Sequence, residues 1–165
     1  MSQFPEKNDL KNLNVLNNNH PSIMADSKPT PQITFTRWAD LENHLRTNGL
    51  GSINAAPGIF HNKLGNTIFK SVPGTSYYRD EFNVTQHIIY TLFGQVGDQD
   101  LNDRYNRPLI GKNTAYLYEV INVSSTKKNY IWYGQVHYDY SELESIQHVD
   151  KNNQIRTIYR LKLTL

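Results

Sequence analysis

The chain ends in QIRTIYRLKLTL (154–165), a sequence in which two kinds of side chain alternate. Its apolar and ring side chains fall on one face of an extended segment and its basic ones largely on the other: Ile155, Thr157, Tyr159, Leu161 and Leu163 against Arg156, Arg160 and Lys162. A period of two is typical of a half-buried strand, because successive side chains of a strand point to opposite faces. We therefore predict a C-terminal β-strand whose apolar face lies in the core.

Four further segments have the composition of strands, being rich in β-branched and aromatic residues. They are TIFKSV (67–72), HIIYTLF (87–93), TAYLYEVINV (114–123) and NYIWYGQVHYDY (129–140). The sequences SSTKKN (124–129) and VDKNNQ (149–154) are polar and rich in Asn and Lys, as turns between strands are. The sequence thus predicts a twisted, mostly antiparallel sheet that closes toward a barrel.

One helix is expected before these strands, in ITFTRWADLENHLRTNGLG (33–51). Trp38, Leu41 and Leu45 recur at helical spacing, Thr36 can cap the first turn, and Gly49 supplies a C-terminal stop. A short helix is also expected within DQDLNDRYNRPLI (98–110). The predicted fold class is therefore α+β, mostly β.

The chain has 165 residues, the length of one ordinary domain. Residues 1–32 are rich in Asn, Pro, Ser and Lys and predict a flexible tail or linker, which leaves 33–165 as the folded domain. The absence of cysteine excludes disulfides and thiolate metal sites. Neither an apolar run of membrane-spanning length nor the pattern of a signal peptide is found, so we expect a cytoplasmic protein without membrane contact.

Residues with recognisable catalytic spacing are not found in the sequence. The six histidines lack the helical pairing of a hydrolytic zinc site, and no Glu-x-Lys or Asp-x-Lys triplet lies on a predicted strand. We predict no metal site, no cofactor and no catalytic residue, and expect a binding role for this chain rather than an enzymatic one. A compact metal-dependent nuclease around His61, Asp98 and Asp100 is retained as an alternative.

The segment SYYRDEFNVTQHIIYTLFGQVGDQ (76–99) combines aromatic rings with an acid and polar groups. Paired rings can stack on a planar base, and a carboxylate can bond to its edge. The residues of suitable type are Tyr77, Tyr78, Asp80, Tyr90 and Thr91. Tyrosines on strands also pack without any binding role, so chemistry alone leaves the pocket and the ordinary strand both open.

The order of several motifs resembles the SRA (SET and RING-associated) domain, a module that recognises modified cytosine in DNA. The motifs are PGIFH (57–61), GTSYYRDEF (74–82), IIYTLFGQVGDQ (88–99), NRPLI (106–110), YLYEVI (116–121), YIWYGQVHYDY (130–140) and RTIYRLKL (156–163). The resemblance implies a PUA-like β-barrel that flips the cytosine out of the duplex. It also implies the following roles: Tyr77 or Tyr78 as the first stacking ring, Asp80 as the base-reading acid, Tyr90 as the second ring and Thr91 as pocket wall.

The sequence departs from this family in one segment. Only LFGQVG (92–97) stands where eukaryotic members carry a long finger, so a wedge would come from GIFHNKLGN (58–66) or NDRYNRP (102–108). We expect Gln95, Asp98 and Gln99 to shape the pocket. The residues expected to contact the DNA backbone or form the wedge are His61, Asn62, Lys63, Lys70, Arg79, Arg104 and Arg107. Hydroxymethyl- or glucosylated cytosine and a sulfur-modified backbone remain alternative targets.

Short-finger domains of this kind resemble the readers of bacterial modification-dependent restriction systems. The resemblance implies double-stranded DNA with modified cytosine, including 5-methylcytosine, as the partner, and a fused or associated nuclease. An RNA-binding PUA-like module is the other alternative, and the formal charge of +2 permits either nucleic acid.

Overall fold

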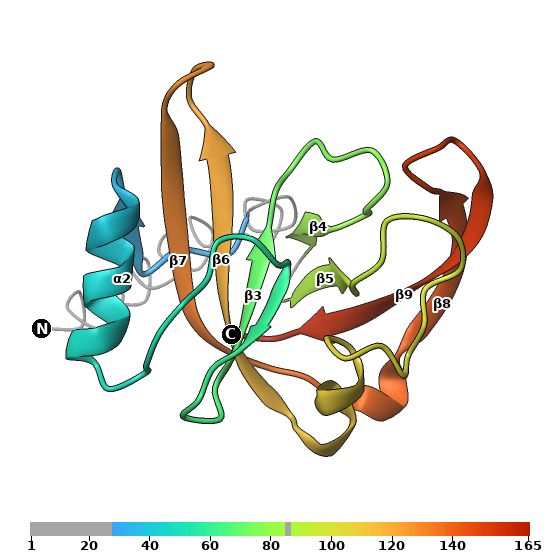
Figure 1. Ribbon diagram of the computed structural model, residues 1–165, viewed down its shortest axis with the longest axis horizontal. Coiled ribbons are helices and arrows are strands. Elements are labelled where there is room, and N and C mark those ends of the chain that lie inside the picture. The colour runs from blue at the N-terminus through green and yellow to red at the C-terminus, as the bar shows by residue number, and fades with distance from the viewer. Residues whose placement is uncertain (1–27, 85–86) are drawn as a thin grey trace, which may run out of the picture.

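The computed structural model describes residues 28–84 and 87–165, and the strands in this part form two sheets (Figure 1). The elements are β1 (Ile33–Phe35), α2 (Trp38–Thr47), β2 (Ile59–His61), β3 (Thr67–Ser71), β4 (Glu81–Val84), β5 (His87–Thr91), η2 (Arg107–Gly111), β6 (Thr114–Asn122), β7 (Lys128–His137), η3 (Tyr140–Glu142), β8 (Glu144–Val149) and β9 (Ile155–Leu163). The prediction of a mostly β fold with an N-terminal helix is confirmed. The strands form two separate sheets and do not close into one barrel.

The larger sheet has the strand order β1-β7-β6-β3-β2, and α2 packs beside β1 and β7. All its pairs are antiparallel except β3 with β6, which run parallel. Leu41 and Leu45 of α2 are fully buried against Ile68, Tyr118 and Trp132. The helix thus covers one face of this sheet, at the far left of Figure 1.

The smaller sheet has the strand order β4-β5-β9-β8, and all its pairs are antiparallel. Its buried side chains join those of the larger sheet in one core, which includes Phe69, Tyr90, Leu117, Leu161 and Leu163. The loops that leave β3 and β5 lie where the two sheets meet (Figure 1). This junction positions the site described below.

The C-terminal strand is where we predicted it, but its first half is buried on the opposite face. Arg156, Ile158 and Arg160 are at most 9% exposed, whereas Ile155 is 70% exposed. The prediction that the arginines lie away from the interior was wrong. Backbone carbonyls and carboxylates meet the guanidinium groups inside the fold, which a hydropathy pattern cannot reveal.

The two ends of helix α2 differ in how they are capped. The N-cap residue is Arg37, in an extended conformation and without a side-chain capping bond, so the expected cap at Thr36 was wrong. At the C-terminus Gly49 has φ 71°, and its N–H donates to the carbonyl of Arg46 while that of Leu50 donates to Leu45. This is the Schellman arrangement, and it confirms Gly49 as the stop.

Residues 1–27 of the predicted tail lie outside the described residues. Within the rest of that segment, the N–H of Gln32 donates to the carbonyl of Trp132 at 2.9 Å. Lys28 pairs with Glu119 at 3.2 Å, and Glu119 is only 1% exposed. Residues 28–32 therefore run along the larger sheet. None of the helices in the described ranges is long and apolar enough to cross a membrane.

Gly134 lies at the bulge between β6 and β7 with φ 81°, and a Cβ there would collide with the side chain of Gln32. We expect Gly134→Ala to lower the free energy of unfolding by about 1–3 kcal/mol, because an L-residue is strained at this φ. Chemical denaturation measures the change. Gly111→Ala is the control, since a Cβ at Gly111 meets nothing within 4 Å. An equal effect of the two substitutions would contradict the prediction.

Candidate functional site

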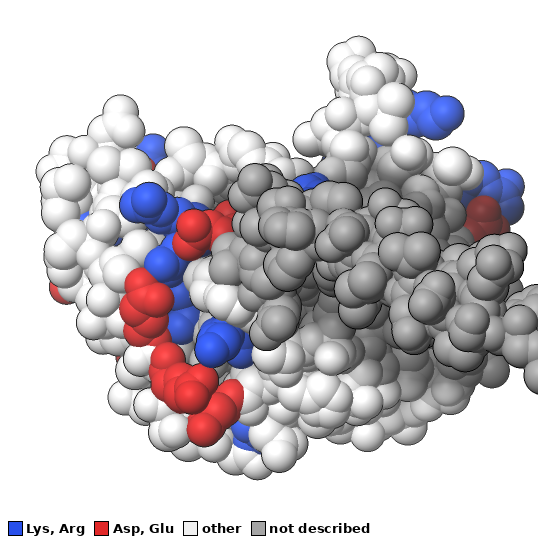
Figure 2. Space-filling view, turned by 180° about the vertical axis from the view of Figure 1, so that it is seen from behind, with Lys and Arg blue, Asp and Glu red and all other residues white. Residues whose placement is uncertain are grey.

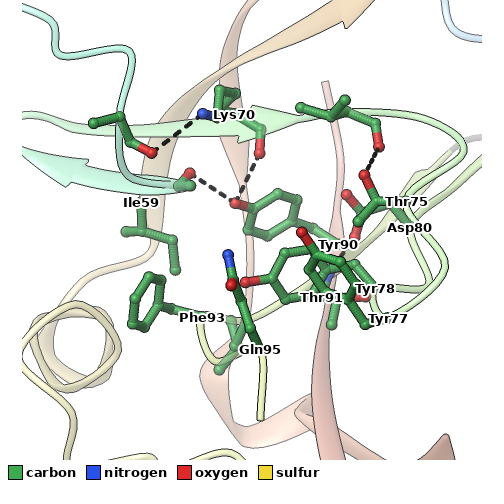
Figure 3. A pocket seen from close by; sticks show the side chains of 14 residues that line it. Ile59, Lys70, Thr75, Tyr77, Tyr78, Asp80, Tyr90, Thr91, Phe93 and Gln95 are labelled. Atoms are coloured by element: carbon green, nitrogen blue, oxygen red, sulfur yellow. Dashed lines mark hydrogen bonds between the residues drawn. The ribbon is translucent and has the colours of Figure 1, made fainter. Parts of the chain in front are cut away.

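A cavity of about 230 Å³ opens where the loops after β3 and β5 meet (Figure 3). Its lining residues are Ala56, Gly58, Ile59, Lys70, Val72, Thr75, Tyr77, Tyr78, Asp80, Tyr90, Thr91, Leu92, Phe93 and Gln95. The five residues predicted to form a base pocket are all in this lining. The cavity lies just below the range of roughly 300–1,000 Å³ that holds drug-sized ligands, so it suits one small planar group.

Tyr90 forms the floor of the cavity. It is 3% exposed, and its ring stacks on that of Phe69 with centroids 4.5 Å apart. Its hydroxyl donates to the carbonyls of Gly58 and Lys70, at 2.8 and 3.1 Å. Burial raises the pKa of Tyr90 well above its ordinary value, so the hydroxyl stays protonated. One face of this ring is therefore committed to the core, and its position is fixed by two hydrogen bonds.

Asp80 lies beside Tyr90 and connects two strands. Its Oδ2 accepts from the hydroxyl of Ser71 at 2.5 Å, and its Oδ1 accepts from the N–H of Thr91 at 2.6 Å. Burial raises the pKa of Asp80, and the bonds from Ser71 and Thr91 offset part of that effect. Each oxygen retains a lone pair beyond the bond it accepts. The carboxyl group can therefore accept a further hydrogen bond from a ligand in the cavity.

Tyr77 and Tyr78 form the aromatic wall on the side of Asp80 and Thr91 (Figure 3). Their ring centroids are 5.0 Å apart with an interplanar angle of 59°, and both side chains are half-buried. Burial raises the pKa of Tyr78, so this hydroxyl also stays protonated near neutral pH. The tilt between the rings means that a flat ligand can stack on only one of them.

Arg156 holds two walls of the cavity together, a role that the sequence analysis missed. Its Nη1 donates to the carbonyls of Gly94 and Gly97, at 2.6 and 3.2 Å. Its Nη2 donates to the carbonyl of Tyr77 at 2.5 Å, and the residue is 1% exposed. The guanidinium thus links the loop after β5 to the segment that carries the tyrosines. No sequence signal identified it, because alternation along β9 placed Arg156 outside.

The loop 92–99 is anchored to the smaller sheet by the residues predicted to shape it. The side chain of Gln99 donates to the carbonyl of Leu92 at 2.6 Å and accepts from the N–H of Tyr159 at 2.8 Å. Asp98 accepts from the N–H of Thr157 at 2.8 Å. Gln95 lies in the cavity lining, whereas Asp98 and Gln99 lie behind it.

The predicted backbone-contacting residues differ in their environment. Lys63, Arg79, Arg104 and Arg107 are exposed. Lys70 is half-buried in the cavity lining, where its ammonium donates to the carbonyl of Ala55 at 2.5 Å and burial lowers its pKa. On the rear face, acidic and basic side chains lie side by side among the described residues and form no continuous basic patch there (Figure 2). The described part of that face therefore offers little attraction to a polyanion.

His61 and Asn62 are held by hydrogen bonds within the β2–β3 hairpin. Asn62 is 7% exposed, and its amide donates to the carbonyls of Leu50 and Ser52 while its oxygen accepts from two N–H groups of the hairpin. His61 contacts Thr67 and the carbonyl of Tyr105, both at 2.8 Å. The two segments predicted as alternative wedges therefore lie side by side.

The alternative nuclease centre is not assembled in the described ranges. Among residues 28–84 and 87–165, no three His, Asp or Glu side chains gather closely enough to hold a metal ion. His61 faces Tyr105, Asp98 faces the backbone of Thr157, and Asp100 accepts from the N–H of Asn102. These three side chains are engaged in separate local contacts.

Solved structures with the same arrangement of sheets are SRA domains. The SRA domain of SUVH5 in complex with fully methylated CG DNA has a TM-score of 0.50 at 18% identity, covering 85% of this chain and 92% of that one. The sulfur binding domain and SRA domain of ScoMcrA, complexed with phosphorothioated DNA, give a TM-score of 0.58 at 14% identity. The modification-dependent TagI restriction endonuclease gives 0.52 at 15%. This chain therefore has the SRA fold.

The match covers a smaller share of the longer proteins than of this chain. The match covers 87% of this chain but 43% of the ScoMcrA chain, and 84% of this chain but 50% of TagI. Neither the protein-family models nor the sequences of curated proteins give a match to this chain. The similarity is therefore found in the three-dimensional structure. It agrees with the SRA resemblance that the order of motifs along the sequence predicted.

Proposed function

We propose that this chain binds double-stranded DNA containing modified cytosine and takes the modified base into the cavity beside Asp80. The observation that carries the proposal is that Tyr77, Tyr78, Asp80, Tyr90 and Thr91 line one cavity. Tyr77, Tyr78 and Asp80 precede β4, whereas Tyr90 and Thr91 end β5, and together they combine aromatic faces with a carboxyl group. Aromatic faces and a hydrogen-bonding edge are what a flipped base requires.

The chemistry of the cavity fits a cytosine. Its exocyclic N4 amine is a donor, and the carboxylate of Asp80 has free acceptor capacity once Ser71 and Thr91 are bound. Tyr77 or Tyr78 supplies the stacking face, and the ring of Tyr90 closes the floor. Thr75, Lys70 and Gln95 add polar groups to the lining, where a substituent of the base can lie.

The biological setting follows from the proteins of the same fold. ScoMcrA and TagI are restriction endonucleases that depend on DNA modification or phosphorothioation. In the proposed role this chain is the reader of such a system in the bacterial cytoplasm, and a fused or associated nuclease cuts the DNA. Arg79, Arg104, Arg107 and Lys63 contact phosphates, which gives affinity without sequence information.

A binding panel tests the proposal directly. The chain is titrated with duplexes of one sequence carrying cytosine, methyl-, hydroxymethyl- or glucosylated cytosine, or a phosphorothioate linkage, at a fixed salt concentration. We expect at least one modified base to bind roughly 10-fold more tightly than cytosine, since its substituent adds burial or a hydrogen bond in the lining worth about 1–1.5 kcal/mol, whereas the N4 contact is common to both bases. Equal affinity for all duplexes contradicts the proposal. Preference for structured RNA, or cleavage on adding Mg²⁺ or Mn²⁺, indicates one of the two alternatives.

A further inference from the structure

A second, wider groove of about 590 Å³ adjoins the cavity. Its lining residues are Asn54, Ala56, Pro57, Phe60, His61, Phe93, Arg104 and Tyr105, of which Ala56 and Phe93 also line the cavity. The two spaces are therefore adjacent, and these two residues border both of them. The groove lies between the β2–β3 hairpin and the loop before η2, the two segments that the sequence analysis named as wedge candidates.

Aromatic rings and one cation dominate the groove. The rings of Phe93 and Tyr105 have centroids 4.5 Å apart and are tilted by 49°. The guanidinium of Arg104 lies 4.7 Å from the centroid of the Tyr105 ring and donates to its hydroxyl at 2.7 Å. Phe60 completes the aromatic lining, and the three rings are half-buried. Such a surface offers flat faces for stacking beside a positive charge.

A chain of hydrogen bonds fixes the position of Tyr105. Its backbone carbonyl can only accept, so the Nε2 of His61 carries the proton in this 2.8 Å contact. The Nδ1 of His61 then accepts from the hydroxyl of Thr67, which in turn accepts from the Lys112 ammonium at 3.1 Å. Burial lowers the pKa of His61, in keeping with a neutral imidazole. The groove is thus built on a positioned backbone rather than on a free loop.

We propose that this groove stacks the nucleotide next to the flipped base in the same DNA strand, an inference that rests on the proposed function. Because Ala56 and Phe93 border both spaces, a nucleotide next to a base in the cavity comes to lie over the groove. No acidic side chain is among the residues that line the groove, and Arg104 offers a contact to the anionic backbone. Stacking on Phe93, Tyr105 or Phe60 tolerates every base because each has a flat face.

The test is a double-mutant cycle between the protein and the DNA. Duplexes carry the preferred modified cytosine, flanked on its 5′ or 3′ side by either a normal nucleotide or a reduced abasic site. We expect the wild type to lose about 5- to 150-fold in affinity when the abasic site lies on one particular side. Tyr105→Ala should bind the normal duplex more weakly by a similar factor, and should lose less than about 2-fold further with the abasic site.

Three variants make the result interpretable. Tyr105→Phe keeps the ring and should retain the full effect of the abasic site. Arg104→Gln should weaken binding and flatten its salt dependence, whereas Arg46→Gln makes the same change of charge on α2, outside the groove lining, and should do neither. Circular dichroism and a retained preference for modified DNA show that Tyr105→Ala is folded.

The outcomes separate the two proposals. If the wild type and Tyr105→Ala lose equal affinity with the abasic site on either side, the groove does not stack the neighbouring base, while the base pocket stands. If the wild type shows no preference for any modified duplex, the proposed function and this inference are both wrong.

Discussion

The Asp80→Ala variant is expected to bind modified and unmodified duplexes with equal affinity. Asp80 is the acidic residue in the cavity lining, and it supplies the acceptor oxygens beside the tyrosine rings. Without this acceptor the base is not held in the cavity and its substituent is not read, so binding of the modified duplex should fall by roughly 5- to 150-fold, the value of a contact worth about 1–3 kcal/mol. Parallel titrations of the variant and the wild type with the two duplexes measure this ratio. A preference that survives the substitution would mean that the base-reading group lies elsewhere.

Glu142→Ala is the matched control for this experiment. Glu142 is an exposed acid on η3, outside the cavity lining, so its removal changes the net charge by the same amount. Any effect of net charge alone on DNA binding should therefore be the same in the two variants. Only Asp80→Ala should lose the ratio between modified and unmodified DNA.

The Asp80→Asn variant tests whether Asp80 is needed mainly for folding or for reading the base. Burial raises the pKa of Asp80, so between the unfolded and the folded pKa the folded protein holds a proton that the unfolded chain has already lost. Stability therefore falls as pH rises from the unfolded pKa through the folded pKa, and the ionised carboxyl is unfavourable at neutral pH. We expect the melting temperature of Asp80→Asn at pH 7 to equal or exceed that of the wild type. A large decrease would indicate that the bonds to Ser71 and Thr91 matter mainly for folding.

The second large effect is expected at Arg156. Its guanidinium group donates to the carbonyl of Gly94 in the loop 92–99 and to the carbonyl of Tyr77, and the residue is 1% exposed. A lysine keeps the charge but cannot span the two segments in the same geometry. We expect Arg156→Lys to lower the free energy of unfolding by about 2–4 kcal/mol, because buried carbonyls lose charge-assisted partners. Urea denaturation measures the loss.

The same variant should also weaken the modified-base preference, because its two cavity walls are no longer tied together. Lys162→Gln serves as control, since Lys162 is an exposed cation on the same strand. It should leave both unfolding and preference close to those of the wild type. If Arg156→Lys is as stable as Lys162→Gln, the guanidinium does not act as the link proposed here.

Much of the local structure could be predicted because it depends on short-range chemistry. The strands at 67–71, 87–91, 114–122, 128–137 and 155–163 lie, to within one residue, in the segments that β-branched and aromatic residues indicated. Gly49 ends α2 because a positive φ favours glycine. The cap at Thr36 failed because several residues compete for a helix start and packing chooses among them, here placing Arg37 at the N-cap.

The sequence by itself determined the fold class, five of the segments that become strands and the five predicted base-pocket residues of the cavity lining, since these follow from periodicity and from the order of motifs. Only the tertiary structure decided which faces are buried. Arg156 and Arg160 lie inside because carbonyls and carboxylates of distant segments meet them there. The groove of Phe60, Phe93 and Tyr105 likewise exists only where three separate segments come together. Such partners are distant in sequence, so no local pattern encodes them.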